Sequence, residues 1–332
     1  MTDKLLDIKN LSTHFFTEDS TIKAVNDVSI HVKKGEILGV VGESGCGKSV
    51  TTLSALRLIN KPGKTVAGKA LFNGVDLLEI PEKEIREIRG NKISMIFQEP
   101  LTSLNPVFTI GNQISETIRK HQKVNKKEAK EISIEMLRKV DMPNPERQYN
   151  SFPHLLSGGM RQRVMIAMAL SCNPELLIAD EPTTALDVTI QAQILKLMKH
   201  LRKKIQTSII LITHDLGVVA EMCDRVVVMY AGEVVEENNV ISLFENPKHP
   251  YTQGLLNSTP KIHQSDYKLE SIKGNVPPSD KMPTGCKFHP RCPFAMEICK
   301  SKPPLLKQKG DSKVSCWLYQ DNNVENKIGE KV

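Results

Sequence analysis

The sequence predicts an α/β fold with a mainly parallel sheet at its core, and two observations support this prediction. Short apolar runs of strand length, such as SIILIT at 208–213, alternate along the chain with segments of helical periodicity. A glycine-rich loop, GESGCGKS at 42–49, lies between an apolar run and one of these helical segments. Because parallel strands need long crossover connections, alternating strands and helices usually build a parallel sheet covered by helices.

The first hundred residues are predicted to be mostly strands, with one helix directly after the glycine-rich loop and another at PEKEIREIRG. The latter begins with a proline, which suits a first helical turn, and ends in a glycine. The strand segments share alternating or continuous apolar residues and are LLDIKNL, AVNDVSIHV, ILGVVG, KALFNGVDLL and KISMIFQ.

The middle of the chain is predicted to be helical and charged, and the last part changes in composition. The middle is followed by strands ELLIAD, SIILITHD and RVVVMYAGEVVE, with helix VTIQAQILKLMKHLRKK after the first of them. Beyond Asn246 proline, lysine and cysteine become more frequent and the periodicity fades. We therefore predict one domain at 1–245, with a helical subdomain at about 100–165, and a small irregular cysteine-containing domain at 246–332.

Composition and charge argue against some classes of function. The 332 residues carry 45 basic and 38 acidic side chains, a net charge of +7, and only 5% are aromatic. Nucleic-acid-binding surfaces usually interleave basic residues with aromatic ones, so we expect no nucleic-acid partner. No run reaches the roughly 18 apolar residues that cross a bilayer, and the N-terminus lacks the apolar segment of a secretory signal. We expect a cytosolic chain whose thiols stay reduced.

The glycine-rich loop fits the phosphate-binding pattern G-x-x-x-x-G-K-[ST], and its place between a strand and a helix is the context that the pattern requires. Glycines let the backbone wrap closely, so that successive N–H groups and the helix N-terminus face phosphates. We expect Lys48 to reach the β- and γ-phosphates and Ser49 to ligate Mg²⁺. A chance glycine-rich turn is the alternative. The predicted phosphate-binding residues are Gly42, Glu43, Ser44, Gly45, Cys46 (through its backbone N–H), Gly47, Lys48, Ser49 and Val50.

ELLIADEP at 175–182 supplies two carboxylates for the same chemistry. Its four apolar residues predict a buried strand that delivers Asp180 to the carboxyl end of the sheet, where ligands of open α/β sheets bind. There Asp180 can hold Mg²⁺, and Glu181 can polarise an attacking water as a general base. A capped strand end is the alternative explanation of a lone Asp-Glu pair. With the phosphate loop upstream, ATP hydrolysis is the leading hypothesis.

LSGGMRQR at 156–163 predicts another anion-binding helix N-terminus. Ser157 and the backbone amides of Gly158 and Gly159 could contact a γ-phosphate. A single nucleotide has little use for two complete phosphate cradles in one chain. Two chains that face head to tail, each offering this cradle to the ATP of the other, would use both.

These motifs together resemble those of the ATP-binding-cassette (ABC) ATPases, and the match covers most of 1–240. GESGCGKS corresponds to the Walker A motif of that family and LSGG to its signature motif, with Met160 in the place of the usual glutamine. Because backbone amides carry the signature contact, we expect ATP binding to persist. The resemblance implies a P-loop NTPase cassette with a mainly parallel core, an antiparallel β subdomain and a helical subdomain. It also implies ATP and Mg²⁺ bound between two cassettes.

The resemblance implies roles for residues outside these motifs. Gln98 in MIFQEP corresponds to the Q-loop glutamine, which senses Mg²⁺ and contacts the transmembrane partner. Asp187 in TTALD corresponds to the D-loop near the dimer seam, and His214 in LITHD to the switch histidine that contacts the γ-phosphate. Phe15 is the candidate for the aromatic that stacks on adenine, with Phe16 close behind, and a core phenylalanine is the alternative. The expected catalytic residues are Glu181, His214 and Gln98, and the expected Mg²⁺ ligands are Ser49, Gln98 and Asp180.

Further stretches resemble the ATPase subunits of oligopeptide and dipeptide importers, a group that includes nickel and opine-type systems. They are QEPLTSLNP (98–106), LSGGMRQRVMIAMAL (156–170), NPKHPYTQGLL (246–256), GNVPP (274–278) and CKFHPRCPFAMEIC. The resemblance implies a peripheral protein on the cytoplasmic face of the membrane. Its partners would be a similar ATPase subunit or a second copy, two permeases, and indirectly an extracellular peptide-binding protein. The residues after Gln98 would receive a permease helix.

Three alternatives to a peptide importer remain. A nickel or metallophore importer would share the same motifs. A soluble cassette ATPase acting on nucleic acid or ribosomes normally carries two cassettes, whereas this chain has a single phosphate loop and a single LSGG. A non-enzymatic scaffold is disfavoured by the presence of Glu181 and His214.

The last part of the chain gathers Cys286, Cys292, Cys299 and Cys316, separated by five, six and sixteen residues. Structural zinc sites usually use C-x₂₋₄-C pairs, so these gaps fit zinc poorly. Iron–sulfur clusters accept varied spacings and often a Cys-Pro ligand, as at 292–293, and the importer resemblance also implies a 4Fe–4S cluster. Zinc and free thiols are the alternatives. A metal would staple a tail that has little core of its own. The remaining cysteines lie in the cassette and are not expected to join: Cys46, Cys172 and Cys223.

Overall fold

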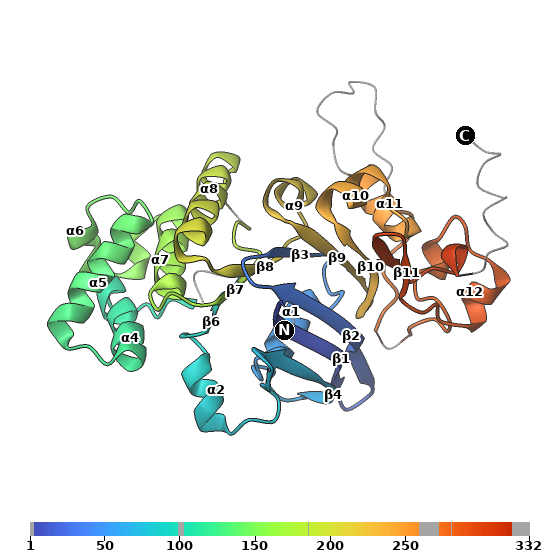
Figure 1. Ribbon diagram of the computed structural model, residues 1–332, viewed down its shortest axis with the longest axis horizontal. Helices are drawn as coiled ribbons and strands as arrows, with labels where there is room; N and C mark the ends of the chain where they lie inside the picture. The colour runs from blue at the N-terminus through green and yellow to red at the C-terminus, as the bar shows by residue number, and fades with distance from the viewer. Residues whose placement is uncertain (1–2, 99–102, 185, 259–271, 280, 321–332) are drawn as a thin grey trace. The chain divides into compact units, whose positions relative to one another are not determined.

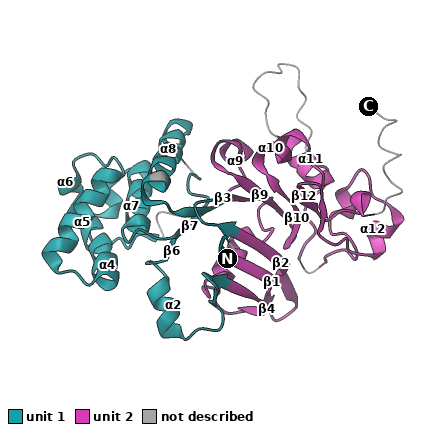
Figure 2. Ribbon diagram, viewed as in Figure 1, with its two compact units in different colours: residues 1–6, 32–37, 71–212 teal, residues 7–31, 38–70, 213–332 magenta. Residues whose placement is uncertain are grey.

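The computed structural model describes residues 3–98, 103–184, 186–258, 272–279 and 281–320. It divides into two compact units, which Figure 2 colours separately. Unit 1 contains residues 1–6, 32–37 and 71–212, and unit 2 contains residues 7–31, 38–70 and 213–332. Of the predicted functional segments, residues 99–102 after the Q-loop glutamine and Ala185 of TTALD lie outside the described residues.

Unit 1 contains a parallel sheet built from three consecutive neighbours, β6 (Ile93–Ile96), β7 (Leu176–Asp180) and β8 (Ser208–Ile212). Every residue of β7 and β8 is buried, as expected for parallel strands that are covered on both faces. In the register of this pair Asp180 lies opposite Ile212. The sheet therefore places Asp180 at its carboxyl edge.

The helices of unit 1 include a group between 110 and 170 that lies together in Figure 1. Its members are α4 (Ile110–Gln122), α5 (Lys126–Lys139), α6 (Pro145–Tyr149) and α7 (Gly158–Leu170). A capping box of Asn125 and Glu128 starts α5, and the buried Ser115 and Ser133 hydroxyls bond across α4 and α5 at 2.9 Å. Helices α2 (Glu82–Ile88) and α8 (Val188–Ile205) are the other α-helices of unit 1 within the described residues.

Unit 2 contains the strand that leads into the phosphate loop. Strand β3 (Ile37–Val41) runs parallel to β9 (Arg225–Tyr230), and β9 turns into the antiparallel β10 (Glu233–Asn239) through Ala231 and Gly232. Both turn residues have positive φ, 48° and 82°, as in the turns that suit tight hairpins. Before residue 258 the α-helices described in this unit are α1 (Lys48–Ala55), α9 (Leu216–Met222), α10 (Val240–Glu245) and α11 (Pro250–Asn257).

The long strands near the N-terminus form the antiparallel part of the protein. Strands β1 (Lys4–Phe16) and β4 (Gly63–Phe72) are neighbours, and β2 (Thr21–Lys33) lies on the other side of β1. The short β5 (Val75–Asp76) pairs with the end of β4. The side-chain hydroxyls of Thr13 and Ser54 bond at 2.7 Å, which ties β1 to α1.

The C-terminal part of unit 2 is short in regular structure but is built onto the sheet. Strand β12 (Ser312–Val314) pairs antiparallel with β10, with Glu236 opposite Val314, and β11 (Lys307–Lys309) pairs with β12. Helix α12 (Glu297–Ser301) and two short 3-10 helices, His289–Arg291 and Trp317–Tyr319, are the other regular elements described in this segment. These pairings cross the predicted boundary at residue 245, and the division into 1–245 and 246–332 stays a prediction.

Among the helices that the structure describes, none is long and apolar enough to span a bilayer.

Candidate functional site

The phosphate loop connects β3 to α1 and depends on glycines at defined positions. Gly42, Gly45 and Gly47 have φ of 151°, 78° and 97°, a region that side chains rarely adopt. A Cβ at Gly42 would overlap the carbonyl oxygen of Met229, and one at Gly47 would lie 2.5 Å from the carbonyl oxygen of Ala24. The backbone of the loop therefore passes too close to its neighbours for any other residue at Gly42 or Gly47.

Lys48 brings its charge into this loop. Its side chain is only 5% exposed, and Nζ donates to the carbonyl oxygens of Gly42 at 2.8 Å and Glu43 at 3.1 Å. Gly47 is the N-cap of α1, and because it has no side chain it gives the first helical N–H groups no side-chain cap. The loop thus combines a buried ammonium with a helix N-terminus, which is an arrangement that suits phosphate groups.

Cys46 lies inside the loop but has no features of a reactive thiol. It is buried, and burial raises the pKa of its thiol above the ordinary value. Its backbone carbonyl accepts a hydrogen bond from Gly232 at 3.0 Å. Its backbone N–H, the group predicted to face the phosphates, donates to the carbonyl oxygen of Glu43 at 3.3 Å, and a phosphate contact of Cys46 stays a prediction.

In unit 1, the end of β7 and the segment after β6 meet at the carboxylate of Glu181. Nε2 of Gln98 donates to Oε2 of Glu181 at 3.0 Å, and Oγ1 of Thr184 donates to the same oxygen at 2.9 Å. The structure therefore brings together two of the three predicted catalytic residues. Thr184 was not predicted; it lies in the same TTALD stretch as the predicted Asp187, but nothing in its spacing distinguishes it from the neighbouring Thr183.

Asp180 and Glu181 differ in setting although they are adjacent. Asp180 ends the buried strand β7 and is 5% exposed. Glu181 has a positive φ of 45°, which is uncommon outside glycine and often marks functional sites, and its N–H donates to the carbonyl oxygen of Ile212 at 2.9 Å. The turn holds the Glu181 carboxylate away from the strand, toward Gln98 and Thr184.

His214 lies in unit 2, directly after the apolar residues of SIILIT. Its side chain is exposed, whereas the adjacent Thr213 is buried and donates its N–H to the carbonyl oxygen of Val40 at 3.3 Å. Asp215 on the other side caps α9 by accepting the N–H groups of Gly217 and Val218. The exposed His214 thus stands between two residues that hydrogen bonds hold in place.

The LSGG segment forms the start of α7 in unit 1, as the sequence predicts. Ser157 is the N-cap and accepts the N–H of Met160 at 3.3 Å. Gly159 allows close packing against α8, because a Cβ there would lie 2.9 Å from Cγ2 of Ile190. Asp187 caps α8 by accepting the N–H of Ile190 at 2.9 Å. The helix N-termini of the signature and D-loop segments are therefore packed together, with Ser157, Gly158 and Asp187 exposed.

The two aromatic candidates at the end of β1 differ in exposure. Phe15 is half-buried, and a Cβ on Gly63 would lie 2.7 Å from its ring. Phe16 is 48% exposed and meets the ring of His14 edge-on. The adenine-stacking role of Phe15 stays a prediction.

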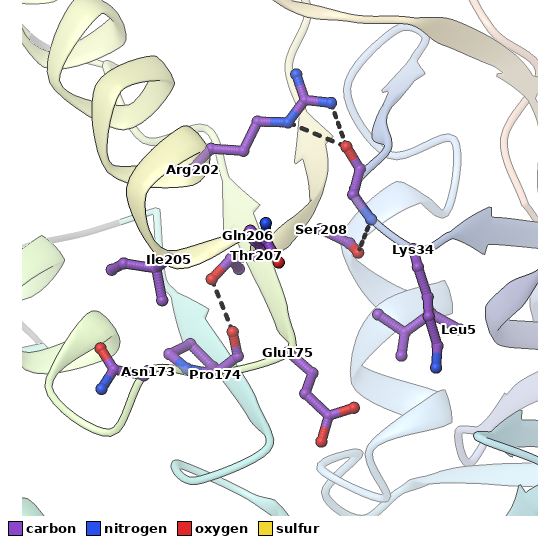
Figure 3. Close-up of a pocket in the computed structure, with 11 residues that line it drawn as sticks. Leu5, Lys34, Asn173, Pro174, Glu175, Arg202, Ile205, Gln206, Thr207 and Ser208 are labelled. Atoms are coloured by element: carbon purple, nitrogen blue, oxygen red, sulfur yellow. Dashed lines mark hydrogen bonds between the residues drawn. The ribbon is translucent and has the colours of Figure 1, made fainter.

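A cavity of about 710 Å³ in unit 1 lies away from these residues. It opens at the amino ends of β7 and β8, and residues such as Lys34, Glu175 and Arg202 line it (Figure 3). Arg202 donates to the carbonyl oxygen of Gly35, as does Thr207 to that of Pro174. None of the predicted site residues lines this cavity.

The four C-terminal cysteines lie together in unit 2, and all are free thiols. They lie close enough that neighbouring thiols add to the raised pKa values of Cys286, Cys292 and Cys316, with burial as the main cause. Burial raises the pKa of Cys286 to about 11 and that of Cys316 to about 12, and backbone N–H groups of Phe288 and Leu318 act in the opposite direction. Among the described residues, no group of three or more His, Cys, Asp or Glu side chains is arranged to hold a metal ion. The four thiols lie near one another, as predicted. Their arrangement does not support the predicted metal site.

Comparison with known proteins identifies the family. A family model described as "ABC transporter" matches residues 25–184, and one described as "Oligopeptide/dipeptide transporter, C-terminal region" matches residues 235–299. The chain is 54% identical over 328 residues to the "Probable peptide ABC transporter ATP-binding protein y4tR" of Sinorhizobium fredii, a match that covers 98% of this chain and 97% of the relative. The chain belongs to the ABC transporter ATP-binding proteins.

Other members of the ABC transporter family support the same conclusion. The chain is 54% identical over 323 residues to the "Oligopeptide transport ATP-binding protein AppD" of Bacillus subtilis, covering 97% of this chain and 98% of the relative. The dimeric structure of the ATP-binding cassette MJ0796 in a post-hydrolysis state with ADP and phosphate is similar with a TM-score of 0.64. It is 28% identical, and the match covers 71% of this chain and 98% of that one. The predicted cassette fold and the predicted ATPase class are confirmed.

Proposed function

We propose that this ABC ATPase powers the import of dipeptides or oligopeptides through partner permeases. The observation that carries the proposal is the match of residues 235–299 to the C-terminal region of oligopeptide and dipeptide transporters, because the cassette alone is common to ABC transporters of many functions. The relatives named above, which are described as peptide transport proteins and match over nearly the full chain, support it. A related nickel or metallophore importer is the alternative cargo class.

Each part of the proposed reaction has a residue in the described structure. Lys48 and the uncapped N–H groups of α1 bind and orient the phosphates of ATP. Glu181 orients and deprotonates the attacking water, while Gln98 and Thr184 hold its carboxylate through hydrogen bonds. His214 contacts the γ-phosphate. A Mg²⁺ ion held by Ser49, Gln98 and Asp180 would neutralise charge on the β- and γ-phosphates.

A second cassette completes the proposed ATP site. Ser157, Gly158 and Gly159 at the start of α7 contact the ATP of the partner, with Asp187 near the seam between the two chains. The partner is a similar ATPase subunit or a second copy of this chain, and the dimeric state of the MJ0796 cassette supports such an arrangement. The pair acts with two permeases at the cytoplasmic face of the membrane. ATP favours the closed pair and hydrolysis releases it.

Cys286, Cys292, Cys299 and Cys316 are proposed to hold a 4Fe–4S cluster, with zinc as the alternative. The thiols are close enough to influence one another, yet no described group is arranged for a metal ion. The preference for a cluster over zinc rests on the spacing of the cysteines, with five, six and sixteen residues between them, and on the Cys-Pro pair at 292–293. The raised thiol pKa values mean that binding must release protons. Iron and sulfide analysis of anaerobically purified protein tests this: zinc without iron would contradict it.

The ATPase proposal is tested with Glu181→Gln in the full chain. Because a general base contributes roughly 10²- to 10⁴-fold, we expect kcat for ATP hydrolysis to fall by about that range while ATP binding is retained. Glu175→Gln is the matched control, since Glu175 forms an ion pair with Lys92 at 2.9 Å and lies away from Gln98 and Glu181. Unchanged hydrolysis in Glu181→Gln would contradict the role of this residue.

Cargo is tested by uptake into vesicles that contain the ATPase with its co-purifying permeases. ATP-dependent accumulation of labelled dipeptide or oligopeptide is expected, and it should be lost with Glu181→Gln. Accumulation of Ni²⁺ without peptide uptake would favour the alternative importer.

A further inference from the structure

Two residues from the C-terminal part of unit 2 hold Glu43 of the phosphate loop. The guanidinium of Arg291 contacts both carboxylate oxygens, with Nη1 at 2.7 Å from Oε2 and Nη2 at 3.1 Å from Oε1. Oη of Tyr251 accepts the backbone N–H of Glu43 at 2.8 Å. The side chain and the backbone of Glu43 are thus both hydrogen-bonded to residues more than 200 positions later in the chain.

The environment of Arg291 distinguishes this ion pair from an ordinary surface pair. The Arg291 side chain is 5% exposed, and Nε donates to the carbonyl oxygen of Lys273 at 3.1 Å. Its guanidinium lies 5.9 Å from the ring centres of both Tyr230 and Phe288. A bidentate, largely buried pair of this kind has one fixed geometry, whereas exposed pairs are mobile and weak.

Tyr251 belongs to the same packed group. Its ring centre lies 4.7 Å from that of Tyr230 and 5.4 Å from that of Phe288, and Tyr230 and Phe288 meet edge-on at 5.2 Å. Tyr251 is fully buried, so its hydroxyl cannot leave Glu43 without disturbing these rings. We call Tyr230, Tyr251, Phe288 and Arg291 the loop clamp.

We propose that Arg291 and Tyr251 are positioning residues of the ATP site, which fix the start of the phosphate loop and neutralise the carboxylate of Glu43 beside the bound phosphates. This inference rests on the proposed function, because it assumes that the loop binds the phosphates of ATP. It assigns to the C-terminal segment a part in nucleotide binding, in addition to its use in identifying the transporter type.

The position of the Lys48 ammonium depends on Glu43. The ammonium of Lys48 donates hydrogen bonds to the carbonyl oxygens of Gly42 and Glu43. A shift of Glu43 would therefore move the ammonium group that is expected to bind the phosphates. The clamp sets the position of Glu43 from the other side.

The charge of Glu43 also affects phosphate binding. Glu43 is the acidic residue within the loop GESGCGKS, where polyanionic phosphates are expected to bind. An unpaired carboxylate there would repel the phosphates, because like charges a few ångströms apart interact unfavourably. Arg291 cancels that charge. Removing Arg291 should therefore weaken ATP binding chiefly through the Glu43 carboxylate that it leaves behind.

The experiment measures KM and kcat for ATP hydrolysis, with ATP affinity by calorimetry, in the full chain with Arg291→Met, Glu43→Gln and the double variant. We expect Arg291→Met to raise the Kd and KM for ATP about tenfold, which corresponds to a loss of about 1.4 kcal/mol in binding free energy. We expect kcat to change much less. The double variant should regain most of the lost affinity, because it removes the uncompensated carboxylate as well. Tyr251→Phe, which keeps the ring and loses only the acceptor, should raise KM in the same direction.

Lys300→Met is the matched control, because Lys300 pairs with Glu297 at 2.9 Å in the same C-terminal segment but does not touch the loop. Its KM should equal that of the wild type, and circular dichroism establishes that each variant is folded. A folded Arg291→Met with unchanged KM, or a double variant no better than Arg291→Met, would overturn the inference. A wild-type protein that neither binds nor hydrolyses ATP would instead overturn the proposed function.

Discussion

At the scale of single residues, the phosphate loop shows how closely backbone geometry limits the sequence. Gly42 and Gly45 both have positive φ, but their surroundings differ. A side chain at Gly42 would overlap Met229, whereas nothing lies within 4 Å of a Cβ at Gly45. A substitution at Gly45 would therefore meet only an unfavourable φ, whereas one at Gly42 would also meet a steric clash.

This difference yields a prediction. Gly42→Ala must move the loop or β9, so we expect ATP affinity to fall by roughly tenfold or more. Gly45→Ala carries only the conformational cost of a left-handed residue, about 1 kcal/mol, and should bind ATP more tightly than Gly42→Ala. Calorimetric titration with ATP compares the two. Equal affinities would show that the overlap with Met229 is relieved without disturbing the loop.

The residue scale also shows which parts of the site can be predicted. The phosphate loop, Asp180, Glu181 and LSGG are contiguous motifs, each with a local pattern that one sequence displays. Thr184 gave no such signal, because its role follows from the left-handed turn at Glu181, which directs the carboxylate toward it. Turn conformations at non-glycine residues are poorly indicated by sequence.

At the scale of elements, helix α11 begins with a buried histidine that links three segments. His249 accepts the N–H of Tyr251 at its Nδ1 at 3.0 Å, and its own N–H donates to Oε2 of Glu236 on β10 at 2.8 Å. Burial lowers the pKa of His249 to about 3, with a hydrogen bond to the backbone of Ser315 acting in the opposite direction. The imidazole is thus neutral in the folded protein over a wide range of pH.

A dependence of stability on pH follows. The pKa of His249 is lower in the folded chain than the value of about 6.5 in the unfolded chain, so the unfolded state binds more protons between these values. Its contribution to stability is complete above pH 6.5 and is lost as pH falls toward 3. Between pH 7 and pH 5 we expect a loss of about 2 kcal/mol in the free energy of unfolding from this residue.

Urea unfolding of wild type and His249→Asn at both pH values measures this loss. Asparagine keeps an acceptor for the helix cap but does not titrate. Burial raises the pKa of Glu236, so this residue makes the free energy of unfolding fall with rising pH in both proteins. The difference between the two proteins therefore isolates the contribution of His249. Identical pH dependence in the two proteins would contradict a neutral buried His249.

The elements themselves were largely predictable. Strands such as SIILI and LLIAD are continuous apolar runs, and α5 has a capping box, so local signals agree with the fold. The pairing of β12 with β10 was not predicted, because Ser312–Val314 is a short strand without a distinct pattern. Short edge strands owe their conformation to the strand beside them.

At the scale of the whole molecule, the loop clamp relates the cysteine-rich segment to nucleotide binding. Arg291 stands directly before Cys292, and the turn from Cys286 to Cys292 is held by hydrogen bonds from His289 to Cys286 and from Cys292 to His289. Lys287 in the same turn donates to the carbonyl oxygen of Ala231 at 2.8 Å. No sequence pattern indicates the contact of Arg291 with Glu43, because a pairing across 248 positions leaves no local trace.

We therefore predict that a change at the cysteines alters the handling of ATP. Cys292→Ser should raise the KM for ATP in the same direction as Arg291→Met, since it removes one thiol of the proposed cluster site from the turn that carries the guanidinium. Cys172→Ser is the control, because Cys172 lies in unit 1 outside the cysteine group. Steady-state ATPase assays of the two variants suffice. A Cys292→Ser protein with wild-type KM would show that the turn keeps its shape without that thiol.

The contact between Glu43 and Arg291 also bears on how the protein is made. The phosphate loop leaves the ribosome early, whereas Tyr251 and Arg291 follow 208 and 248 residues later. At about 5–20 residues per second, the loop waits on the order of 10 to 50 s for the arginine. The loop is therefore made before the residues that clamp it, and we expect full ATP affinity only after Tyr251 and Arg291 have emerged and packed against it.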